Sequence, residues 1–317
     1  MLREMEVDNN NIGTAIQYFR ETYHISQNRL CKGICSVATL SRIEAGERDV
    51  DSFILEMLLE RLGKVANQFE LILTDFDYEA YQYRTEINNR IKDKDIEAAY
   101  ELIQKYSDLT NDKGSPHRQF IMVSQALLNE LEGGKPETTI DLLMKAISCT
   151  VPDFNINEIT DYFLSKSEFN IIIDILQRMI SIGMNDSAHK VLNQVIGYLY
   201  WHSQMEQNNR LYPKVAVIAA RFYMEQKQLD KALDICNLGI QMHKGYYKME
   251  SIGELFYIKA QITEIKLKSE GKWKESKKKE CLKMYLQAYY TLKFCGDSDV
   301  GKIKKHLEEE YQWEDID

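Results

Sequence analysis

Apolar residues recur along most of this sequence at the spacing of an α-helix rather than of a β-strand. One clear stripe, at positions i, i+3, i+4 and i+7, consists of Ile12, Ala15, Ile16 and Phe19. The alternation of apolar and polar residues that marks a half-buried strand is nearly absent. Glycine and proline number only 15 and 4, whereas a β-sandwich or barrel needs a turn after every strand. We therefore predict an all-α protein.

Proline positions and helix lengths divide the chain. Because proline is tolerated in the first turn of a helix and breaks it elsewhere, we interpret every proline as a helix boundary. The helical segments are short at first, and they lengthen and pair after a boundary near Leu73–Tyr78. We predict two domains, residues 1–75 and residues 76–317. The four prolines are Pro116, Pro136, Pro152 and Pro213.

Composition excludes several classes of protein. At 44% hydrophobic and 28% charged residues, the chain has the composition of a globular domain and not of a disordered one. No apolar run approaches the ~20 residues that cross a bilayer, and the first residues lack a secretory apolar segment. We expect a cytoplasmic protein without membrane contact. The six cysteines and six histidines form no ligand cluster, so we expect reduced thiols, no metal site and no cofactor.

The charge distribution bears on nucleic-acid binding. A net charge of −9 disfavours binding of a polyanion by the whole surface. Between residues 20 and 42, however, four basic residues and one glutamate give a net charge of +3. We therefore predict a positive surface in this segment.

The sequence of residues 1–75 predicts five short helices. Ser26 and Asp51 are placed to cap the second and fourth of them, because their side chains accept hydrogen bonds from the first backbone N–H groups. Gly46 and Gly63 are placed to end the third and fourth in the left-handed conformation. The fifth helix fits Ala66–Leu73. The side chains expected to face the core are Leu30, Ile34, Leu40, Ile43, Ile54, Met57, Leu58 and Leu62.

Two stretches in this domain resemble the helix-turn-helix of Cro/repressor-like (XRE-type) DNA-binding domains. They are SQNRLC at 26–31 and SVATLSRIEAG at 36–46, and the resemblance covers about residues 12–73. The cap, the glutamine after it, the apolar pair and the closing E-x-G all occur in register. The resemblance implies that the second helix of the pair enters the major groove of double-stranded DNA. The alternative is a five-helix bundle that has kept the fold and lost tight DNA binding.

The positions of the side chains predict how DNA is contacted. Gln27, at a helix N-terminus, is placed to reach a phosphate, and Arg42 is the best candidate for a bidentate contact to guanine. Val37 and Ala38 offer only thymine-methyl contacts. Gly33, which we place inside the second helix, costs that helix about 1 kcal/mol relative to alanine. The predicted DNA-binding residues are Gln27, Ser36, Val37, Ala38, Thr39 and Arg42.

Residues 76–317 contain a repeated pair of helices. The clearest copy, VAVIAARFYMEQKQLDKALDICNLGI at 215–240, resembles the tetratricopeptide (TPR) repeat, whose antiparallel helices cross closely where small residues allow it. We predict a right-handed TPR-like α-solenoid of about five hairpins. The C-terminal segment KIKKHLEEEYQW is expected to be a capping helix. The anchor positions in the five copies are Ala99; Ala126, Thr139 and Ala146; Leu176, Ala188 and Val195; Ala220, Ala232 and Gly239; and Ala260, Cys281 and Ala288.

Two further motifs and the search for a catalytic cluster indicate no enzyme. GDSDVGK at 296–302 matches the start of a phosphate-binding loop, but Ile303 replaces the Ser/Thr that would hold magnesium and no strand precedes it. We interpret it as a turn between helices. The lysine-rich stretch 266–283 is interpreted as solvated surface in an extended loop, with contact to a partner as the alternative. No Ser/His/Asp, Cys/His or paired-carboxylate arrangement stands out.

The order of the two domains and the total length resemble the Rgg/PlcR-type regulators of Gram-positive quorum sensing. The resemblance implies a homodimeric transcription regulator whose repeats bind a short signalling peptide in a concave groove. Peptide binding would alter the dimer geometry and so control binding to a promoter palindrome. The alternative is a scaffold whose repeats bind a protein partner without a peptide ligand. The sequence does not distinguish activation from repression.

In such arrays the first helix of each hairpin lines the groove, which selects candidate peptide contacts. The resemblance implies that side-chain amides hold the peptide backbone, so Asn170, Gln177 and Gln261 are the foremost candidates. Counting one and two turns from the small anchors gives the full predicted set: Asn170, Asp174, Gln177, Lys214, Val217, Arg221, Glu254, Tyr257 and Gln261.

Overall fold

The computed structural model describes residues 12–47, 50–64, 74–201, 206–243, 251–297 and 300–314. Within these ranges the chain forms 15 α-helices, one short 3-10 helix and no strand, so the prediction of an all-α protein is confirmed. The chain divides into two compact units, which are described separately below. The first comprises residues 1–194 and 205–207, and the second residues 195–204 and 208–317.

The N-terminal part of the first unit, here called the head, has its own apolar core. Leu30, Leu40 and Leu58 are fully buried in it. Ser26 and Asp51 accept the predicted capping hydrogen bonds, from the N–H groups of Arg29 and Phe53. The fifth helix, predicted at Ala66–Leu73, lies outside the described residues. The helices of the head are α1 (Ile12–Thr22), α2 (Gln27–Cys31), α3 (Val37–Glu44) and α4 (Ser52–Arg61).

Gly33 does not lie inside a helix, so that prediction was wrong. The helix α2 ends at Cys31, and Gly33 follows it with a φ of +79°. Glycine adopts this left-handed conformation without steric cost. An added Cβ would lie 2.0 Å from the carbonyl oxygen of Thr150 and 2.5 Å from Cδ of Pro152. The glycine therefore permits both the turn and a close approach to the repeats.

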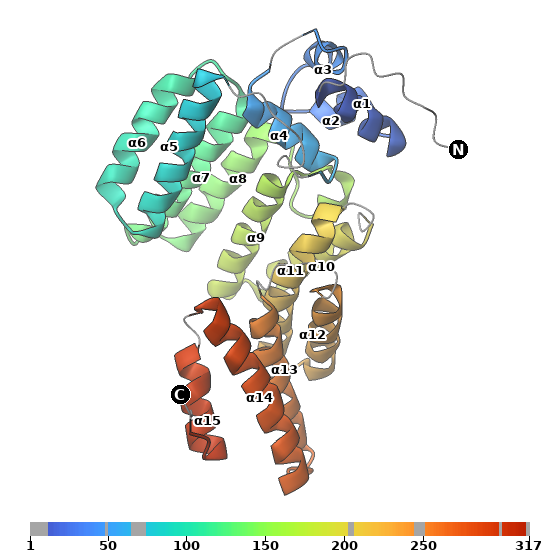
Figure 1. Ribbon diagram of the computed structural model, residues 1–317, viewed down its shortest axis with the longest axis vertical. Helices are drawn as coiled ribbons and strands as arrows, with labels where there is room; N and C mark the ends of the chain where they lie inside the picture. The colour runs from blue at the N-terminus through green and yellow to red at the C-terminus, as the bar shows by residue number, and fades with distance from the viewer. Residues whose placement is uncertain are drawn as a thin grey trace. The chain divides into compact units, whose positions relative to one another are not determined.

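The rest of the first unit consists of helical hairpins. Neighbouring helices from α5 to α9 lie side by side in chain order (Figure 1). The small anchors predicted for this region, such as Ala99, Ala126 and Ala188, are fully buried where the helices cross. The helices are α5 (Asp75–Lys92), α6 (Ile96–Thr110), α7 (Ser115–Leu131), α8 (Pro136–Thr150) and α9 (Lys166–Ser181), with the 3-10 helix at Ile159–Asp161. The next helix, α10 (Asn185–Trp201), begins in this unit and its last residues belong to the second.

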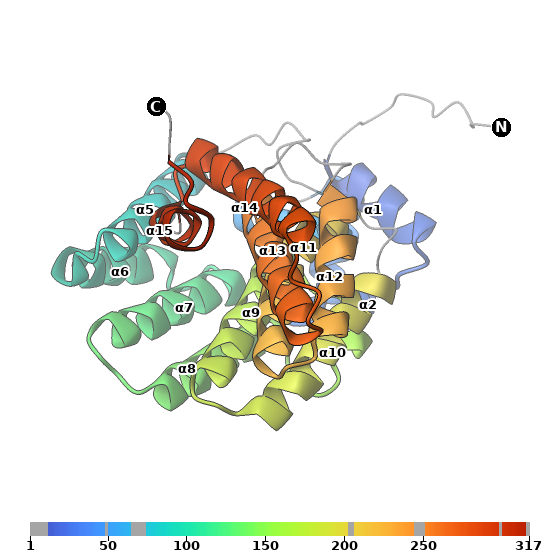
Figure 2. The ribbon, with the colours of Figure 1, turned by 90° about the horizontal axis from the view of Figure 1, so that it is seen from below.

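The second unit continues the repeat pattern. Gly239 shows why its anchors are small, because an added Cβ would lie 2.8 Å from Cβ of Ala216. The last helix packs on α14 (Figure 2) through Ile303 and Leu307, which agrees with the predicted capping helix. The helices are α11 (Glu206–Glu225), α12 (Leu229–His243), α13 (Ile252–Ser269), α14 (Glu275–Cys295) and α15 (Val300–Tyr311).

Two predictions about helix boundaries were wrong. Pro213 lies inside α11, where the helix continues at the cost of the hydrogen bond that proline cannot donate. The lysine-rich stretch 266–283 is mostly helical, with only the turn at 270–274 between α13 and α14. Lysine and glutamate are good helix formers, which explains why both helices extend into it. The other three prolines lie at helix ends, as predicted.

Candidate nucleic-acid interface and groove residues

The helix α3 is held by its apolar side and presents the opposite side to solvent. Ser36 caps it by accepting a hydrogen bond from the N–H of Thr39 at 3.0 Å. Leu40 and Ile43 are buried in the head. The exposed side carries a residue that the prediction omitted, Ser41, which the helical period places one turn after Val37. The exposed residues are Ser36, Val37, Ala38, Ser41 and Arg42.

Arg42 has the freedom that a base contact requires. Its side chain is exposed in the last turn of α3. No hydrogen bond or ion pair engages its guanidinium within the described part of the chain. Arg42 can therefore offer two parallel N–H donors to an acceptor pair such as guanine O6 and N7.

Glu44 forms a polar centre that joins three helices of the head. Its carboxylate accepts hydrogen bonds from Arg20 of α1 at 2.7 Å and from Nε2 of Gln27 of α2 at 2.7 Å. Because hydrogen bonding to Glu44 stabilises its charged form, the pKa of Arg20 is raised. One N–H of the Gln27 amide is thus engaged inside the protein, and the other stays available to a phosphate.

The positive surface predicted between residues 20 and 42 is smaller than the sequence count implies. Arg20 is neutralised by Glu44. Arg29 lies 4.3 Å from the ring centroid of Phe163 and donates to the carbonyl of Asp161 at 3.5 Å. These contacts draw Arg29 toward the repeats, so Arg42 and the exposed Lys32 are the remaining cations of this segment.

Thr39 differs from the other predicted DNA-binding residues. It is half-buried, and its hydroxyl lies 2.9 Å from Oγ of Ser36. It also lines a cavity of about 380 Å³ between the head and the repeats, together with Asp51, Phe76 and Asp112. Thr39 is therefore less accessible to a base edge than its neighbours on α3.

The predicted peptide contacts of the first unit share one face of α9. Asn170, Asp174 and Gln177 follow at intervals of four and three residues, which places them on one side of the helix. Gln177 is exposed, whereas Asn170 and Asp174 are half-buried. The side-chain amide of Gln177 has no hydrogen-bond partner among the described residues, so it can bind an extended backbone.

The six predicted peptide contacts of the second unit lie on α11 and α13. Arg221 and Glu254 form an ion pair at 2.7 Å that joins the two helices. Val217 is 6% exposed and packs within the helix array. The ring of Tyr257 lies against that of Tyr285. Lys214 is exposed and Gln261 half-buried.

Comparisons with known proteins identify a shared fold. No protein-family model and no curated protein matches the sequence. The crystal structure of apo PlcR from Bacillus thuringiensis is similar with a TM-score of 0.54 at 15% identity, over 95% of this chain and 98% of that one. PlcR in complex with the peptide PapR7 and DNA gives a TM-score of 0.53 at 16% identity, over 96% and 100%.

A third structure is less similar. The SHP pheromone receptor Rgg2 from Streptococcus dysgalactiae gives a TM-score of 0.44 at 14% identity, over 95% of this chain and 100% of that one. This score is too low to establish a common fold. The two PlcR structures, each with a TM-score above 0.5, show that this chain has the fold of PlcR, a helical head followed by TPR-like repeats. At 15–16% identity, this structural similarity establishes the fold and does not establish the function.

None of the described residues forms a metal site or a membrane span. No group of three or more histidine, cysteine, aspartate or glutamate side chains is suited to hold a metal ion in the described ranges. None of the helices in those ranges combines the length and the apolar character that crossing a membrane requires.

Proposed function

We propose that this protein is a DNA-binding transcription regulator whose repeat domain senses a short peptide. The observation that carries the proposal is the exposed side of α3, where Arg42 is unengaged on a head with the fold of PlcR. PlcR has been solved with a peptide and DNA bound, which supports both parts of the proposal. Residues 1–75 would bind DNA, and residues 76–317 would bind the peptide and form the dimer.

The proposed mechanism couples the two ligands. An extended peptide would bind to the repeat domain through side-chain amides, for which Gln177 on α9 and Gln261 on α13 are the candidates, because an amide pairs with backbone N–H and C=O groups. Peptide binding would favour one geometry of a homodimer and so change the affinity of its two heads for a palindrome. No catalytic step forms part of the proposal.

Substitution of Arg42 tests DNA binding. Arg42→Ala should weaken binding to a palindromic fragment of the gene's own promoter by about 1–3 kcal/mol and relax the preference at one base pair. Gln27→Ala should weaken binding evenly across sequences, because a phosphate contact carries no base information. The measurement is a gel-shift titration, with Lys92→Ala on α5 as the control for loss of an exposed cation. Unchanged affinity in both head variants would contradict DNA binding.

Substitution of two amides tests peptide sensing. A peptide of roughly five to ten residues, from a short reading frame beside the gene, should bind to the wild type in calorimetry. The double variant Gln177→Ala, Gln261→Ala should lose this binding and keep basal DNA affinity. The matched control replaces Gln104 and Gln287, exposed glutamines on second helices of hairpins. A wild type that binds no such peptide would replace the sensor with the alternative, a scaffold for a protein partner.

A further inference from the structure

One buried arginine connects the head to the repeats. Arg61, in the last turn of α4, is 3% exposed. Its Nη1 donates to the carbonyl oxygens of Leu30 at 2.9 Å and Lys32 at 2.7 Å. Its Nη2 donates to the carbonyl oxygen of Thr150 at 2.9 Å and to Oε1 of Glu168 at 2.6 Å. The side chain of Arg61 thus satisfies acceptors in both parts of the first unit.

The acceptors on the head side lie just before α3. Leu30 belongs to α2, and Lys32 follows its end. Their carbonyl groups lie at the end of that short helix and just after it, and have no partner further along it. By binding both, Arg61 fixes the backbone of the turn from which α3 begins.

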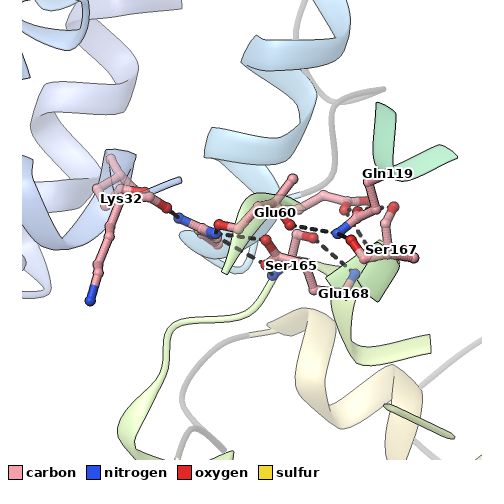
Figure 3. Close-up of polar contacts among 10 residues, drawn as sticks. Lys32, Glu60, Gln119, Ser165, Ser167 and Glu168 are labelled. Atoms are coloured by element: carbon pink, nitrogen blue, oxygen red, sulfur yellow. Dashed lines mark hydrogen bonds and ion pairs between the residues drawn. The ribbon is translucent and has the colours of Figure 1, made fainter. Parts of the chain in front are cut away.

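The acceptors on the repeat side are themselves held in place (Figure 3). Glu168, which is 0% exposed, accepts from the N–H of Ser165 at 2.6 Å, and Ser165 caps α9 in return at 3.1 Å. Thr150 ends α8, and its hydroxyl accepts from Nε2 of Gln119 of α7 at 2.5 Å. Arg61 is therefore tied to the junction of α8 and α9 and, through Gln119, to α7.

The α2–α3 turn and the α8–α9 junction also pack closely against each other beside Arg61. Gly33 lies in the turn that Arg61 binds, and it approaches the carbonyl of Thr150 too closely for any Cβ. At the other end of α4, Nε2 of the buried His117 on α7 donates to Oδ2 of Asp51 at 2.7 Å. Both ends of α4 are therefore bound to the repeats by hydrogen bonds of buried side chains, Arg61 at one end and His117 at the other.

Arginine suits this position because its planar guanidinium donates in several directions at once. A lysine would keep the charge beside Glu168, but its ammonium has three donors in a compact tetrahedral group. Buried ion pairs of this kind often add little net stability, since desolvation offsets attraction, and some serve to specify one geometry. That is the role the contacts of Arg61 indicate.

We propose that Arg61 is a positioning residue for the recognition helix. It holds the α2–α3 turn on the α8–α9 junction, so that α3 moves with the first repeats rather than on a free linker. The proposal deepens the proposed function and rests on it, because it takes the head to be the DNA-binding part. A rearrangement at the α8–α9 junction is then transmitted to α3 through Arg61.

The test disrupts the contact between the α2–α3 turn and the α8–α9 junction in two ways, both in the full-length protein. Arg61→Lys removes several of the hydrogen bonds and keeps the charge, and Gly33→Ala forces the turn away from Thr150. The matched controls are Arg178→Lys, which affects an arginine–glutamate pair between α9 and α7, and Gly183→Ala. Gly183 has a similar φ of +77°, but an added Cβ would meet no atom within 4 Å, so its variant reproduces the strain without the clash.

Two readouts follow each variant. The first is backbone amide exchange of residues 30–37 and 148–168, measured by mass spectrometry. The second is binding to palindromic duplexes in which the distance between half-sites is changed by half a helical turn. A fixed head should discriminate strongly between these distances, because both half-sites must face two rigidly held helices.

We expect Arg61→Lys and Gly33→Ala to give the same changes, and the two control variants to give neither. Exchange should rise by about tenfold or more in both segments together, as local opening of one cooperative unit predicts, and the discrimination between half-site distances should be lost. Unchanged exchange in either segment, or unchanged discrimination, would overturn the positioning role. If the wild type binds none of the duplexes, the proposed function fails, and the exchange data alone decide whether Arg61 couples the two parts.

Discussion

Three buried carboxylates, Glu44, Glu168 and Glu264, each accept several hydrogen bonds from cationic, amide or hydroxyl donors. Removing such a carboxylate leaves its donors unsatisfied, which costs about 1–3 kcal/mol for each buried group. Glu60 on α4 differs from them, because its strongest contact is a hydrogen bond from the N–H of Ser167 at 3.3 Å. Burial raises the pKa of Glu60 to about 7. The ionised form of Glu60 is therefore unfavourable in the folded state.

The surroundings of Glu60 determine how its protonation changes the stability of the protein with pH. Besides burial, the carboxylates of Glu56 and Glu168 raise its pKa, whereas the N–H of Ser167 and the charge of Lys166 lower it. In the unfolded chain the carboxyl titrates near 4.5. Between 4.5 and about 7 the folded state binds the additional proton, so the stabilisation is fully present at low pH and is lost as the pH rises through 7.

Replacement of Glu60 by glutamine should therefore stabilise the protein in alkaline solution. Glu60→Gln keeps an acceptor for Ser167 and removes the charge, so we expect a gain of about 1–2 kcal/mol near pH 8 and little change near pH 5. The measurement is urea unfolding at several pH values. Glu101→Gln, at an exposed position of α6, serves as the control. A gain that is independent of pH would show that the charge of Glu60 is not its cause.

At the scale of the elements, the sequence predicted what local periodicity determines. The small anchors Ala126, Ala220 and Ala260 repeat at positions where helices must cross, and all three are fully buried. The caps Ser26 and Asp51 were also predictable, because a cap and its acceptor lie within a few residues of each other. Helical spacing and capping are local signals, and they give the order and pairing of the helices.

Contacts between distant segments were not predictable in the same way. Arg61 binds the carbonyl of Thr150 and the carboxylate of Glu168, and no periodicity connects these positions. One signal was present, since Arg61 stands three residues after the fully buried Leu58 and so on the inward face of α4. A cation at a core position indicates a buried partner. Gly33 was misplaced for a related reason, because its role depends on Thr150.

The last helix offers an element-scale prediction through Glu264 of α13. Its carboxylate, 4% exposed, accepts from Nε2 of His306 and the hydroxyl of Tyr311 on α15, each at 3.1 Å. Burial opposes its ionisation, but hydrogen bonds from Lys268, Tyr285 and His306 outweigh burial and lower its pKa. The carboxylate of Glu264, in its charged form, therefore holds α15 against α13.

Loss of that charge should release the last helix. Glu264→Gln should destabilise the packing of α15 by about 2 kcal/mol at neutral pH, because hydrogen bonds to a charged acceptor are the stronger ones. The stabilisation from a lowered carboxyl pKa is lost as the pH falls, so the difference from the wild type should shrink in acid. Amide exchange in α15 is the measurement, with Glu308→Gln on its exposed side as control. Equal exchange in the two variants would rule out this anchoring role.

At the scale of the whole molecule, the head and the first repeats form one compact unit. The buried contacts of Arg61 and His117 explain why the head is not a separate body on a linker. A head held in this way has a fixed direction in which α3 faces outward. The repeats then determine the direction in which α3 faces. A domain that binds a peptide must be coupled to α3 in some such way if it is to influence DNA binding.

The number of available contacts on one head leads to a prediction about assembly. The exposed side of α3 offers two apolar residues, Val37 and Ala38, two short hydroxyl side chains, Ser36 and Ser41, and one unengaged cation, Arg42. So few side chains provide too little discrimination between DNA sequences for a single head, since each mismatched base pair typically costs about 1–3 kcal/mol. Two heads related by a two-fold axis double the contacts and read half-sites about one helical turn apart.

We therefore predict a homodimer held by the repeat domain, with two chains bound to each palindromic duplex. Sedimentation at micromolar protein concentration should give a dimer both alone and with DNA, because the repeats and not the duplex supply the interface. Affinity should fall by at least about tenfold on a duplex with a single half-site, where the second head finds only non-specific contacts. A monomer in the presence of the palindrome, or equal affinity for one and two half-sites, would mean that a single head suffices and that control through dimer geometry is not available to this protein.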